Sequence, residues 1–366
     1  STGSVRLPGT LNARHVDQNI VNAYAHFWSA AFERELFERT VFSAEYSGSA
    51  GRKLYSISNP NRIGSDAVYG TGDGLGCVGF GGTCDPTNPL GRLNPLIAPL
   101  NTRGNLGRSN YNAMILSIDS SNLRDLGLQF TARYTYSHTK DNLSSTFSES
   151  GNNFNLGLLD HFNPDLDYGY ADFDVRHRFS TSFNYSIGGN RPVGTGFMNQ
   201  AFGGWTLTGI FTASTGAPFS IFDCTLAFFE VCPRLAPTGG IPFSTPDDPA
   251  PADGAPNTFK LIDLSNQVGG TFANPVLGIA EFGPFPANMT ERNAFRGPGF
   301  WNVDAGLYKN FRVTEGSTIQ IRGEVYNVFN HANMFLQGGT AEVNEAFVSG
   351  KRFGRRHVQL AAKFIF

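Results

Sequence analysis

The chain has 366 residues and a formal net charge of −2; only 16% of its residues are charged, while 13% are aromatic. Residues of both signs are spread along the chain, so nothing suggests a nucleic-acid partner. No segment approaches the roughly 18 consecutive apolar residues of a membrane-spanning helix. These features exclude a helical membrane protein and give no reason to expect nucleic-acid binding.

Nine segments are predicted to be β-strands. In chain order they cover residues 24–36, 40–50, 109–122, 128–137, 175–187, 205–214, 299–311, 318–329 and 353–366. In the segment 128–137, Leu128, Phe130 and Tyr134 share one face while polar residues occupy the other, because side chains alternate along a strand. Alternating runs of about ten residues can cross a bilayer when tilted, whereas strands of soluble sheets are typically about five or six residues long.

Charged residues occupy the polar faces of several predicted strands. They are Arg133, Arg176, Arg178, Arg322 and Glu324. Such charges would be costly in the dry interior of a β-sandwich, whereas the water-filled lumen of a transmembrane barrel accommodates them. We therefore predict that these five side chains face a lumen and that the apolar faces contact lipid.

The connections between the strands fall into two alternating classes. Short turns follow Leu36, Leu123 and Phe311, and a medium connection covers Gly188–Gly203. Long connections cover residues 51–108, 141–172, 223–298 and 331–351. Short periplasmic turns and long extracellular loops are typical of outer-membrane barrels. The predicted fold is an all-β, antiparallel transmembrane β-barrel of outer-membrane type that occupies residues 1–366 as a single domain.

The last strand carries a possible assembly signal. Val358, Leu360, Phe364 and Phe366 lie at alternate positions up to the final residue. A terminal strand that ends on an aromatic residue looks like the signal read by the outer-membrane assembly machinery; the alternative is a terminal strand that packs on a core. If Phe366 ends in the periplasm, the four long connections are extracellular.

About nine strands do not make a closed barrel of the usual kind, because single-chain bacterial barrels have even strand numbers. Val5–Leu11 lacks clear alternation and contains Pro8 and Gly9, so Ser1–Asn22 is not expected to supply a tenth strand. The sequence also begins without an initiator Met or a signal peptide. We therefore expect an incomplete barrel, that is, a fragment or a processed chain.

Four cysteines form two local pairs, Cys77 with Cys84 and Cys224 with Cys232. Neither pair has CxxC spacing, and no histidine or further cysteine is close enough to complete a zinc site. Both pairs lie in long connections rich in Gly and Pro, which favours two loop disulfides in an oxidising compartment. Free buried thiols and metal binding are the alternatives.

Patterns for catalysis or cofactor binding are weak. Asp172, Asp174 and His177 suggest a metal site, but on a strand the two aspartates share one face and the histidine lies on the other. No GxSxG motif marks a nucleophile, and the glycine-rich segment Gly72–Gly82 lacks the flanking strand and helix of a dinucleotide-binding loop. We predict no enzyme activity, no cofactor and no metal.

Two short polar motifs are expected to be structural. Gly203-Gly204-Trp205 is interpreted as a turn that leads into an interfacial aromatic residue. Asn327 and Asn330, near a strand end, are expected to hold loop backbone by hydrogen bonds, with a ligand-binding role as the alternative.

Several segments, in this order, resemble one family, the TonB-dependent receptors, in particular the Oar-like group with a carboxypeptidase-regulatory-like amino-terminal domain. They are Ala44–Leu54 (AEYSGSAGRKL), Tyr134–Asp141 (YTYSHTKD), Phe173–Phe179 (FDVRHRF), Gly203–Phe219 (GGWTLTGIFTASTGAPF), Arg296–Phe311 (RGPGFWNVDAGLYKNF), Arg322–Phe335 (RGEVYNVFNHANMF) and the terminal strand. The resemblance implies a barrel of about 22 strands filled by an amino-terminal plug, with a Ton box that contacts energised TonB. We expect TonB to act only through such a plug, which is missing from this sequence.

Two functions agree with these observations. The first is uptake of a substrate across the bacterial outer membrane by a TonB-dependent receptor of which this chain is the carboxy-terminal part. The alternative is a surface-exposed barrel for binding, adhesion or a structural role without transport. In both cases the partners are outer-membrane lipid and the assembly machinery. Peptides, oligosaccharides and metal chelates all fit as the substrate.

Overall fold

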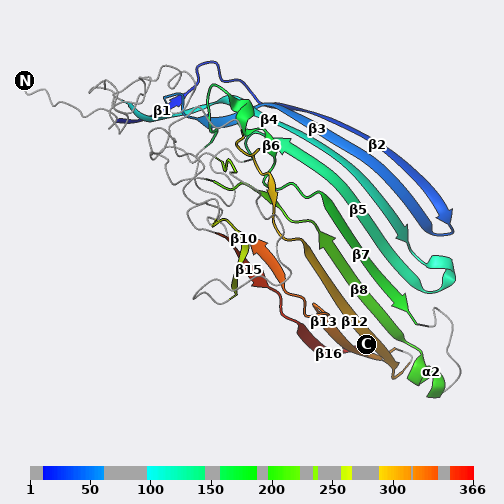
Figure 1. Cartoon of the computed structure of the whole chain (residues 1–366). Helices are drawn as coiled ribbons and strands as arrows, with labels where there is room; N and C mark the ends of the chain where they lie inside the picture. The colour runs from blue at the N-terminus through cyan, green and yellow to red at the C-terminus, as the bar shows by residue number, and fades with distance from the viewer. Residues whose placement is uncertain are drawn as a thin grey trace, which may run out of the picture.

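The structure is a computed structural model, and it describes residues 11–61, 97–144, 157–187, 197–222, 234–237, 257–265, 288–314, 316–336 and 347–366. Its main element is a long, curved sheet (Figure 1). Strands in this sheet follow the order β16-β13-β12-β8-β7-β5-β4-β3-β2, so that sequence neighbours pair as an antiparallel meander. The predicted antiparallel, all-β architecture is confirmed, and within the described residues the sheet is a curved wall that is not closed.

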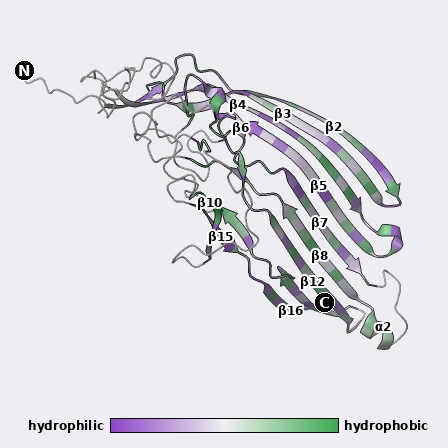
Figure 2. Ribbon diagram, in the orientation of Figure 1, coloured by the Kyte–Doolittle hydropathy of each residue, from purple (hydrophilic) through white to green (hydrophobic). Residues whose placement is uncertain are grey.

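All nine predicted strands are present. They are β2 (Tyr24–Phe37), β3 (Thr40–Ser58), β4 (Ile97–Ser120), β5 (Leu128–Asp141), β7 (His177–Ser186), β8 (Trp205–Ser214), β12 (Phe300–Arg312), β13 (Thr318–Tyr326) and β16 (His357–Ile365). Figure 2 shows hydrophobic and hydrophilic residues in alternating bands along these strands. That period of two fixes which side chains share a face of the sheet.

The predicted limits of β3 and β4 were too short. We expected strands to end at residue 50 and to begin at residue 109, but β3 continues to Ser58 and β4 begins at Ile97. The register between them shifts between Gly51 and Leu54, where Lys53 has a φ of 52°. This bulge interrupts the alternation that we used to recognise strands, and so conceals the extension.

The last predicted strand is two separate strands. Residues up to Phe353 belong to β15 (Phe347–Phe353), and His357 begins β16. Gly354 lies between them with a φ of 123°, a backbone conformation that residues other than glycine rarely adopt. The chain therefore turns at this glycine before it enters the wall.

The sheet does not close on itself. β2 pairs with β3, β16 pairs with β13, and no pairing joins β2 to β16 within the described residues. The first described strand, β1 (Leu11–Val16), pairs in parallel with the beginning of β4. An open edge was the outcome expected from an odd number of strands.

Short connections gather at one end of the sheet, together with the carboxyl terminus (Figure 1). Arg39 makes the turn between β2 and β3, and η1 (Leu123–Asp125) lies between β4 and β5. A short helix, α2 (Phe197–Phe202), precedes β8. Among the described residues no helix has the length and apolar character needed to cross a membrane.

At the opposite end, the long connections form what we call the loop layer: the described residues of 59–61, 142–176, 215–299 and 327–356. It contains a small sheet of β10 (Thr258–Asp263), β15 and β14 (Asn333–Leu336), and a pair made of β9 (Pro218–Phe219) and β11 (Phe295–Arg296). Eight buried residues form its core: Phe219, Ile221, Leu235, Leu261, Ile262, Leu264, Phe295 and Val348. These short strands were not predicted from the sequence.

Contacts join the four long connections to one another. The Leu158 N–H donates to the Ile57 carbonyl at 2.9 Å, and the Arg234 guanidinium lies 2.5 Å from the Asp167 carboxylate. β10, from the third connection, pairs with β15, from the fourth. All four therefore meet at one end of the sheet. The assignment of this end to the cell exterior remains a prediction.

Candidate functional site

Strand register sorts the side chains of the sheet onto two faces. One row of paired residues runs across the sheet from β2 to β12. It contains Glu33, Ser43, Ser117, Arg133, Ser180, Thr212 and Asn302. The adjacent row contains Phe42, Ile118, Ala132, Thr181, Phe211 and Val303. Successive residues of a strand point to opposite faces. We call these the polar face and the apolar face of the sheet.

Four of the five charged residues predicted to face a lumen lie at polar-face positions of the register: Arg133, Arg178, Arg322 and Glu324. The Tyr308 hydroxyl, on the neighbouring strand, donates to the Glu324 carboxylate at 2.9 Å. Arg176 lies one residue before β7, where its guanidinium is 5.0 Å from the centre of the Tyr170 ring. Whether the polar face lines a lumen stays a prediction.

A cavity of 420 Å³ opens on the polar face, next to the loop layer. Its walls carry mainly hydroxyl groups, one aromatic ring from the loop layer and one cation: Ser49, Ser109, Tyr111, Thr135, Ser137, Thr139, Phe173, Val175 and Arg178. We call it the hydroxyl cavity. Volumes of this order are typical of small-molecule sites.

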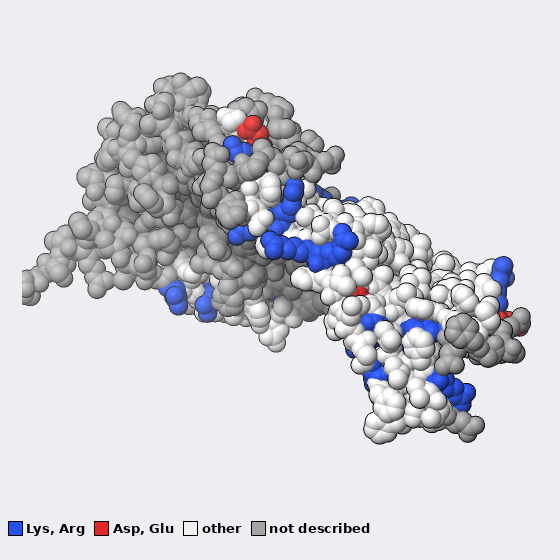
Figure 3. Space-filling view, turned by 90° about the horizontal axis from the view of Figure 1, so that it is seen from below, with Lys and Arg blue, Asp and Glu red and all other residues white. Residues whose placement is uncertain are grey.

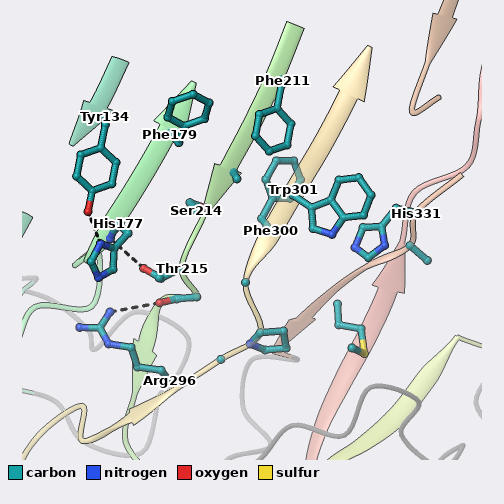
Figure 4. Close-up of a pocket in the computed structure, with 17 residues that line it drawn as sticks. Tyr134, His177, Phe179, Phe211, Ser214, Thr215, Arg296, Phe300, Trp301 and His331 are labelled. Carbon is teal, nitrogen blue, oxygen red and sulfur yellow. Dashed lines mark hydrogen bonds between the residues drawn. The ribbon is translucent and has the colours of Figure 1, made fainter. Parts of the chain in front are cut away.

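A larger cavity of 840 Å³ lies on the apolar face, also beside the loop layer (Figure 4). Tyr134, Phe179, Phe211 and Trp301 supply rings from four strands, and Met334 closes the loop side. We call it the rim pocket. Its walls suit an apolar group at the boundary between the apolar face and the polar loop layer.

Two histidines stand in the rim pocket with aromatic partners. The His177 imidazole Nδ1 lies 2.7 Å from the Tyr134 hydroxyl, and the backbone N–H of His177 donates to Thr215 Oγ1 at 3.2 Å. The His331 ring stacks on Trp301 with centroids 4.1 Å apart. The hydrogen-bond partner of the His177 ring is thus a phenol.

Loop backbone below the rim pocket is held by two asparagines, as predicted. The Asn327 side chain donates to the His331 carbonyl and accepts from the His331 N–H, both at 2.8 Å. Asn330 Oδ1 accepts from the Arg356 N–H at 3.0 Å. Both have a positive φ, which asparagine tolerates better than most residues. The predicted turn at Gly204 also has a positive φ, of 71°, immediately before Trp205.

The loop layer contains a buried ion cluster centred on Arg292. Its guanidinium donates to the Asp141 carboxylate, to Asp172 Oδ1 at 2.8 Å and to Ser144 Oγ at 2.9 Å. The exposed fractions of the Arg292, Asp141 and Asp172 side chains are only 3%, 4% and 7%. Asn293 adds a hydrogen bond to Asp172 at 2.6 Å. The cluster joins the end of β5 to two long connections.

Two further ion pairs extend this arrangement. The Arg296 guanidinium donates to the fully buried Asp174 carboxylate, which also accepts from the Thr139 N–H at 2.7 Å. The Arg234 guanidinium donates to Asp167 at 2.5 Å and to the Leu166 carbonyl at 2.6 Å. When buried charges are paired and hydrogen-bonded in this way, their interactions offset the free-energy cost of removing them from water.

Sequence reasoning missed these ion pairs. Asp172 and Asp174 were recognised as unusual, but they were tested only as metal ligands with His177. Their arginine partners, Arg292 and Arg296, lie about 120 residues away in a long connection for which we predicted no strand. A signal was present, because charges are scarce in this chain and these arginines lie four residues apart beside an aromatic residue.

Basic residues near the chain end were also missed. Lys351, Arg352, Arg355 and Arg356 lie within a stretch of six residues at the junction of β15 and β16. Figure 3 shows a mainly uncharged described surface on which Lys and Arg gather in groups. The Arg352 guanidinium lies 4.4 Å from the centre of the Phe259 ring. This contact holds one of the four basic side chains against β10 of the small sheet.

The structure places one of two further groups of predicted site residues and not the other. Cys77, Cys84, Cys224 and Cys232 all lie outside the described residues. The proposed assembly residues belong to the wall: Val358, Leu360 and Phe364 pair with positions 325, 323 and 319 of β13, and their exposed fractions are 63%, 81% and 55%. Phe366 follows β16 and is 94% exposed. Whether these residues act as an assembly signal stays a prediction.

The described part of the chain contains no group of three or more His, Cys, Asp or Glu side chains that could hold a metal ion. Asp172 and Asp174 instead bind arginines, and His177 contacts Tyr134. The glycine-rich segment 72–82 lies outside the described residues.

Comparison with known proteins gives a family and a set of distant structural relatives. The family model described as "Outer membrane beta barrel domain" matches residues 1–360. No curated protein matches the chain. The solved structures with a similar fold include the outer membrane transporter YddB from Escherichia coli, at 10% identity and a TM-score of 0.44. The ferripyoverdine receptor of Pseudomonas aeruginosa, bound to ferripyoverdine, has 11% identity and a TM-score of 0.41.

A third structure is the ferric citrate transporter FecA in its unliganded form, at 9% identity and a TM-score of 0.38. The alignments cover 97%, 94% and 93% of this chain, but only 34%, 27% and 31% of YddB, the ferripyoverdine receptor and FecA. The chain thus spans about a third of the length of these transporters.

Proposed function

This chain belongs to the outer membrane beta barrel domain family, a family of the bacterial outer membrane, and we propose that it is part of the wall of a TonB-dependent receptor that takes up a substrate. The polar face would line the lumen, the apolar face would contact lipid, and the loop layer would lie outside the cell. TonB would act through an amino-terminal plug encoded elsewhere in a longer chain. The receptor group would be the Oar-like one.

The observation that carries this proposal is the separation of the two faces in an open sheet. Exposed fractions of 57% for Phe32 and 81% for Leu360 would be unfavourable in water, but they suit a wall whose apolar face meets lipid. Arg133, Arg178 and Arg322 all avoid that face. An arginine at the bilayer midplane costs roughly 2–4 kcal/mol, so the choice of face is strongly biased.

The open edges support a wall that continues beyond these strands. In lipid, each unpaired backbone group costs several kcal/mol, so β2 and β16 need further partners. A receptor barrel of about 22 strands would supply them. The order of the segments that resemble Oar-like receptors, from Ala44–Leu54 to the terminal strand, supports the receptor class that we propose.

Two proposals concern the ends of the strands. The loop layer would hold two disulfides, Cys77–Cys84 and Cys224–Cys232, which would restrain the long connections outside the cell. At the other end, Val358, Leu360, Phe364 and Phe366 would present the assembly signal to the outer-membrane assembly machinery.

A surface-binding or adhesion barrel without transport is the second candidate. The observation that favours it is the folded core of the loop layer, since a layer with its own buried residues could present a fixed binding surface. Transport and surface binding differ in their need for TonB, which makes them separable by experiment.

The test is to isolate the native protein from outer membranes, measure its intact mass and photo-crosslink it to TonB in living cells. Uptake predicts a protein longer than 366 residues whose upstream part crosslinks to TonB, and loss of the crosslink when the cytoplasmic membrane is de-energised. A mature protein of only these residues, without a crosslink, would favour the surface-binding role.

A further inference from the structure

The hydroxyl cavity has the composition of a binding site for a polyhydroxylated molecule. Ser49, Ser109, Thr135 and Thr139 line it at polar-face positions of three neighbouring strands. Each hydroxyl can donate one hydrogen bond and accept others, so the wall can match groups of either kind. Ser137 Oγ already donates to the Val175 carbonyl at 2.7 Å, which fixes the loop layer over the cavity.

One cation stands in this wall. Arg178 is exposed, and no carboxylate of the described residues is within salt-bridge distance of its guanidinium. Arg133 occupies the diagonal position on β5, because Arg178 pairs with Thr135 and Arg133 with Ser180. Diagonal neighbours in a sheet are roughly 7–8 Å apart. Arg178 thus lies in the cavity, and Arg133 lies next to it on the polar face of the sheet.

Glu45, on the polar face, lies too far along the sheet to form an ion pair with Arg178. Glu45 is in the same row, but β4 and β5 lie between its strand and β7. At about 4.8 Å per strand, three steps exceed the Debye length of roughly 8 Å at physiological salt. The guanidinium of Arg178 therefore has no carboxylate partner on the polar face within the described residues.

An exposed aromatic ring completes the cavity. Phe173, in the connection before β7, is 64% exposed and lines the same wall as Arg178. A flat apolar surface beside hydroxyl groups suits a sugar ring, whose faces carry C–H groups and whose edge carries hydroxyls. Together with a guanidinium, which binds a carboxylate through paired N–H groups, this composition favours an acidic sugar.

We propose that the hydroxyl cavity binds an acidic oligosaccharide, with a uronate carboxylate on Arg178, a sugar face on Phe173 and sugar hydroxyls on Thr135 and Thr139. Arg133 receives the next carboxylate as the chain moves along the polar face. This proposal rests on the proposed uptake function, because it names the substrate class of the same lumen.

The experiment measures binding to the native protein extracted from outer membranes in detergent, by isothermal titration calorimetry. The probes are hexagalacturonate, which carries carboxylates, and maltohexaose, which is a neutral hexasaccharide. We expect hexagalacturonate to bind at least tenfold more tightly. Arg178→Gln should remove that preference, a change of about 1.4 kcal/mol or more, while Arg178→Lys retains part of it. Phe173→Ala should weaken both sugars.

Lys363→Gln is the matched control, because Lys363 is an exposed cation that pairs with Gln320 on the same face near the short turns. Equal affinities for the two sugars, or an equal loss in Arg178→Gln and Lys363→Gln, would overturn the proposal. Binding in detergent does not involve TonB. A TonB crosslink without sugar binding therefore refutes the substrate class alone, and sugar binding without a crosslink refutes uptake alone.

Discussion

Leucine side chains have opposite environments in the sheet and in the loop layer. Leu360, in β16, is 81% exposed, whereas Leu261, in β10, is 2% exposed within the core of the loop layer. Arginine side chains differ in the same way: Arg133 is exposed on the polar face of the sheet, whereas Arg292 is buried among carboxylates in the loop layer. The sheet thus leaves its apolar groups for lipid, whereas the loop layer buries them as a soluble protein does.

This difference shows where each region obtains its stability. Backbone hydrogen bonds between neighbouring strands hold the sheet, and every side chain of β2 is exposed. The loop layer adds buried apolar area and compensated ion pairs to its short strands. The same substitution should therefore have different effects in the two regions, and each prediction below contrasts them.

The largest effect is expected for Arg292→Met. It leaves Asp141 and Asp172 buried without their guanidinium, and removal of one partner of a buried ion pair costs roughly 3–5 kcal/mol. Amide hydrogen exchange should accelerate in residues 157–172 and stay unchanged in β8. Arg133→Met, in the sheet, removes an exposed charge and should change neither region. Unaltered exchange in Arg292→Met would show that the cluster does not stabilise the loop layer.

A core truncation gives the next contrast. Leu261→Ala should destabilise the loop layer by roughly 2–5 kcal/mol, because it removes buried apolar contacts and leaves a cavity. Leu360→Ala should have a smaller effect on the membrane-inserted protein, since lipid is as apolar as the side chain it replaces. Urea titration followed by hydrogen exchange in β10 and β13 measures both. Equal losses would contradict the assignment of the Leu360 face to lipid.

Introducing a charge tests the faces of the sheet directly. Ile321 and Gln320 are neighbours in β13 on opposite faces, and Ile321 is 50% exposed. Ile321→Arg should impair assembly by an amount equivalent to roughly 2–4 kcal/mol, whereas Gln320→Arg should be tolerated. The heat-modifiable, folded fraction in outer membranes reports the result. If both variants assemble equally well, the proposed faces are wrong.

The two regions also differ in how far sequence patterns predicted them. All nine wall strands were predicted, because a period of two along about ten residues arises from the strand itself and needs no knowledge of distant partners. The faces of Arg133, Arg322 and Glu324 followed from the same period. The prediction failed at β3, where Lys53 interrupts the alternation by a bulge.

The loop layer could not be predicted in this way. Arg292 meets Asp141 across 151 residues of sequence, and β10, in the third long connection, pairs with β15, in the fourth, although the wall strands β12 and β13 lie between them in the sequence. Contacts of this kind depend on the wall to bring the connections together. The hydroxyl cavity is an intermediate case: the face of Arg178 was predictable, but the position of Phe173 over it was not.

The smallest effect is expected for an ion pair at the turn end of the sheet. Arg39 and Asp125 are 3.1 Å apart, but their side chains are 58% and 68% exposed. Such pairs contribute roughly 0–1 kcal/mol, because water and salt screen them. Arg39→Gln should therefore lower the melting temperature slightly at low salt and not at all in 1 M salt, where the Debye length is about 3 Å.

Arg234→Gln is the matched change in the loop layer, because the Arg234–Asp167 pair has exposed fractions of only 3% and 7%. Salt does not reach a buried pair, so its loss should remain large in 1 M salt. Thermal scans of both variants at low and high salt separate the two effects. Equal sensitivity of the two variants to salt would mean that the loop layer is open to solvent, and the contrast between the two regions would then fail.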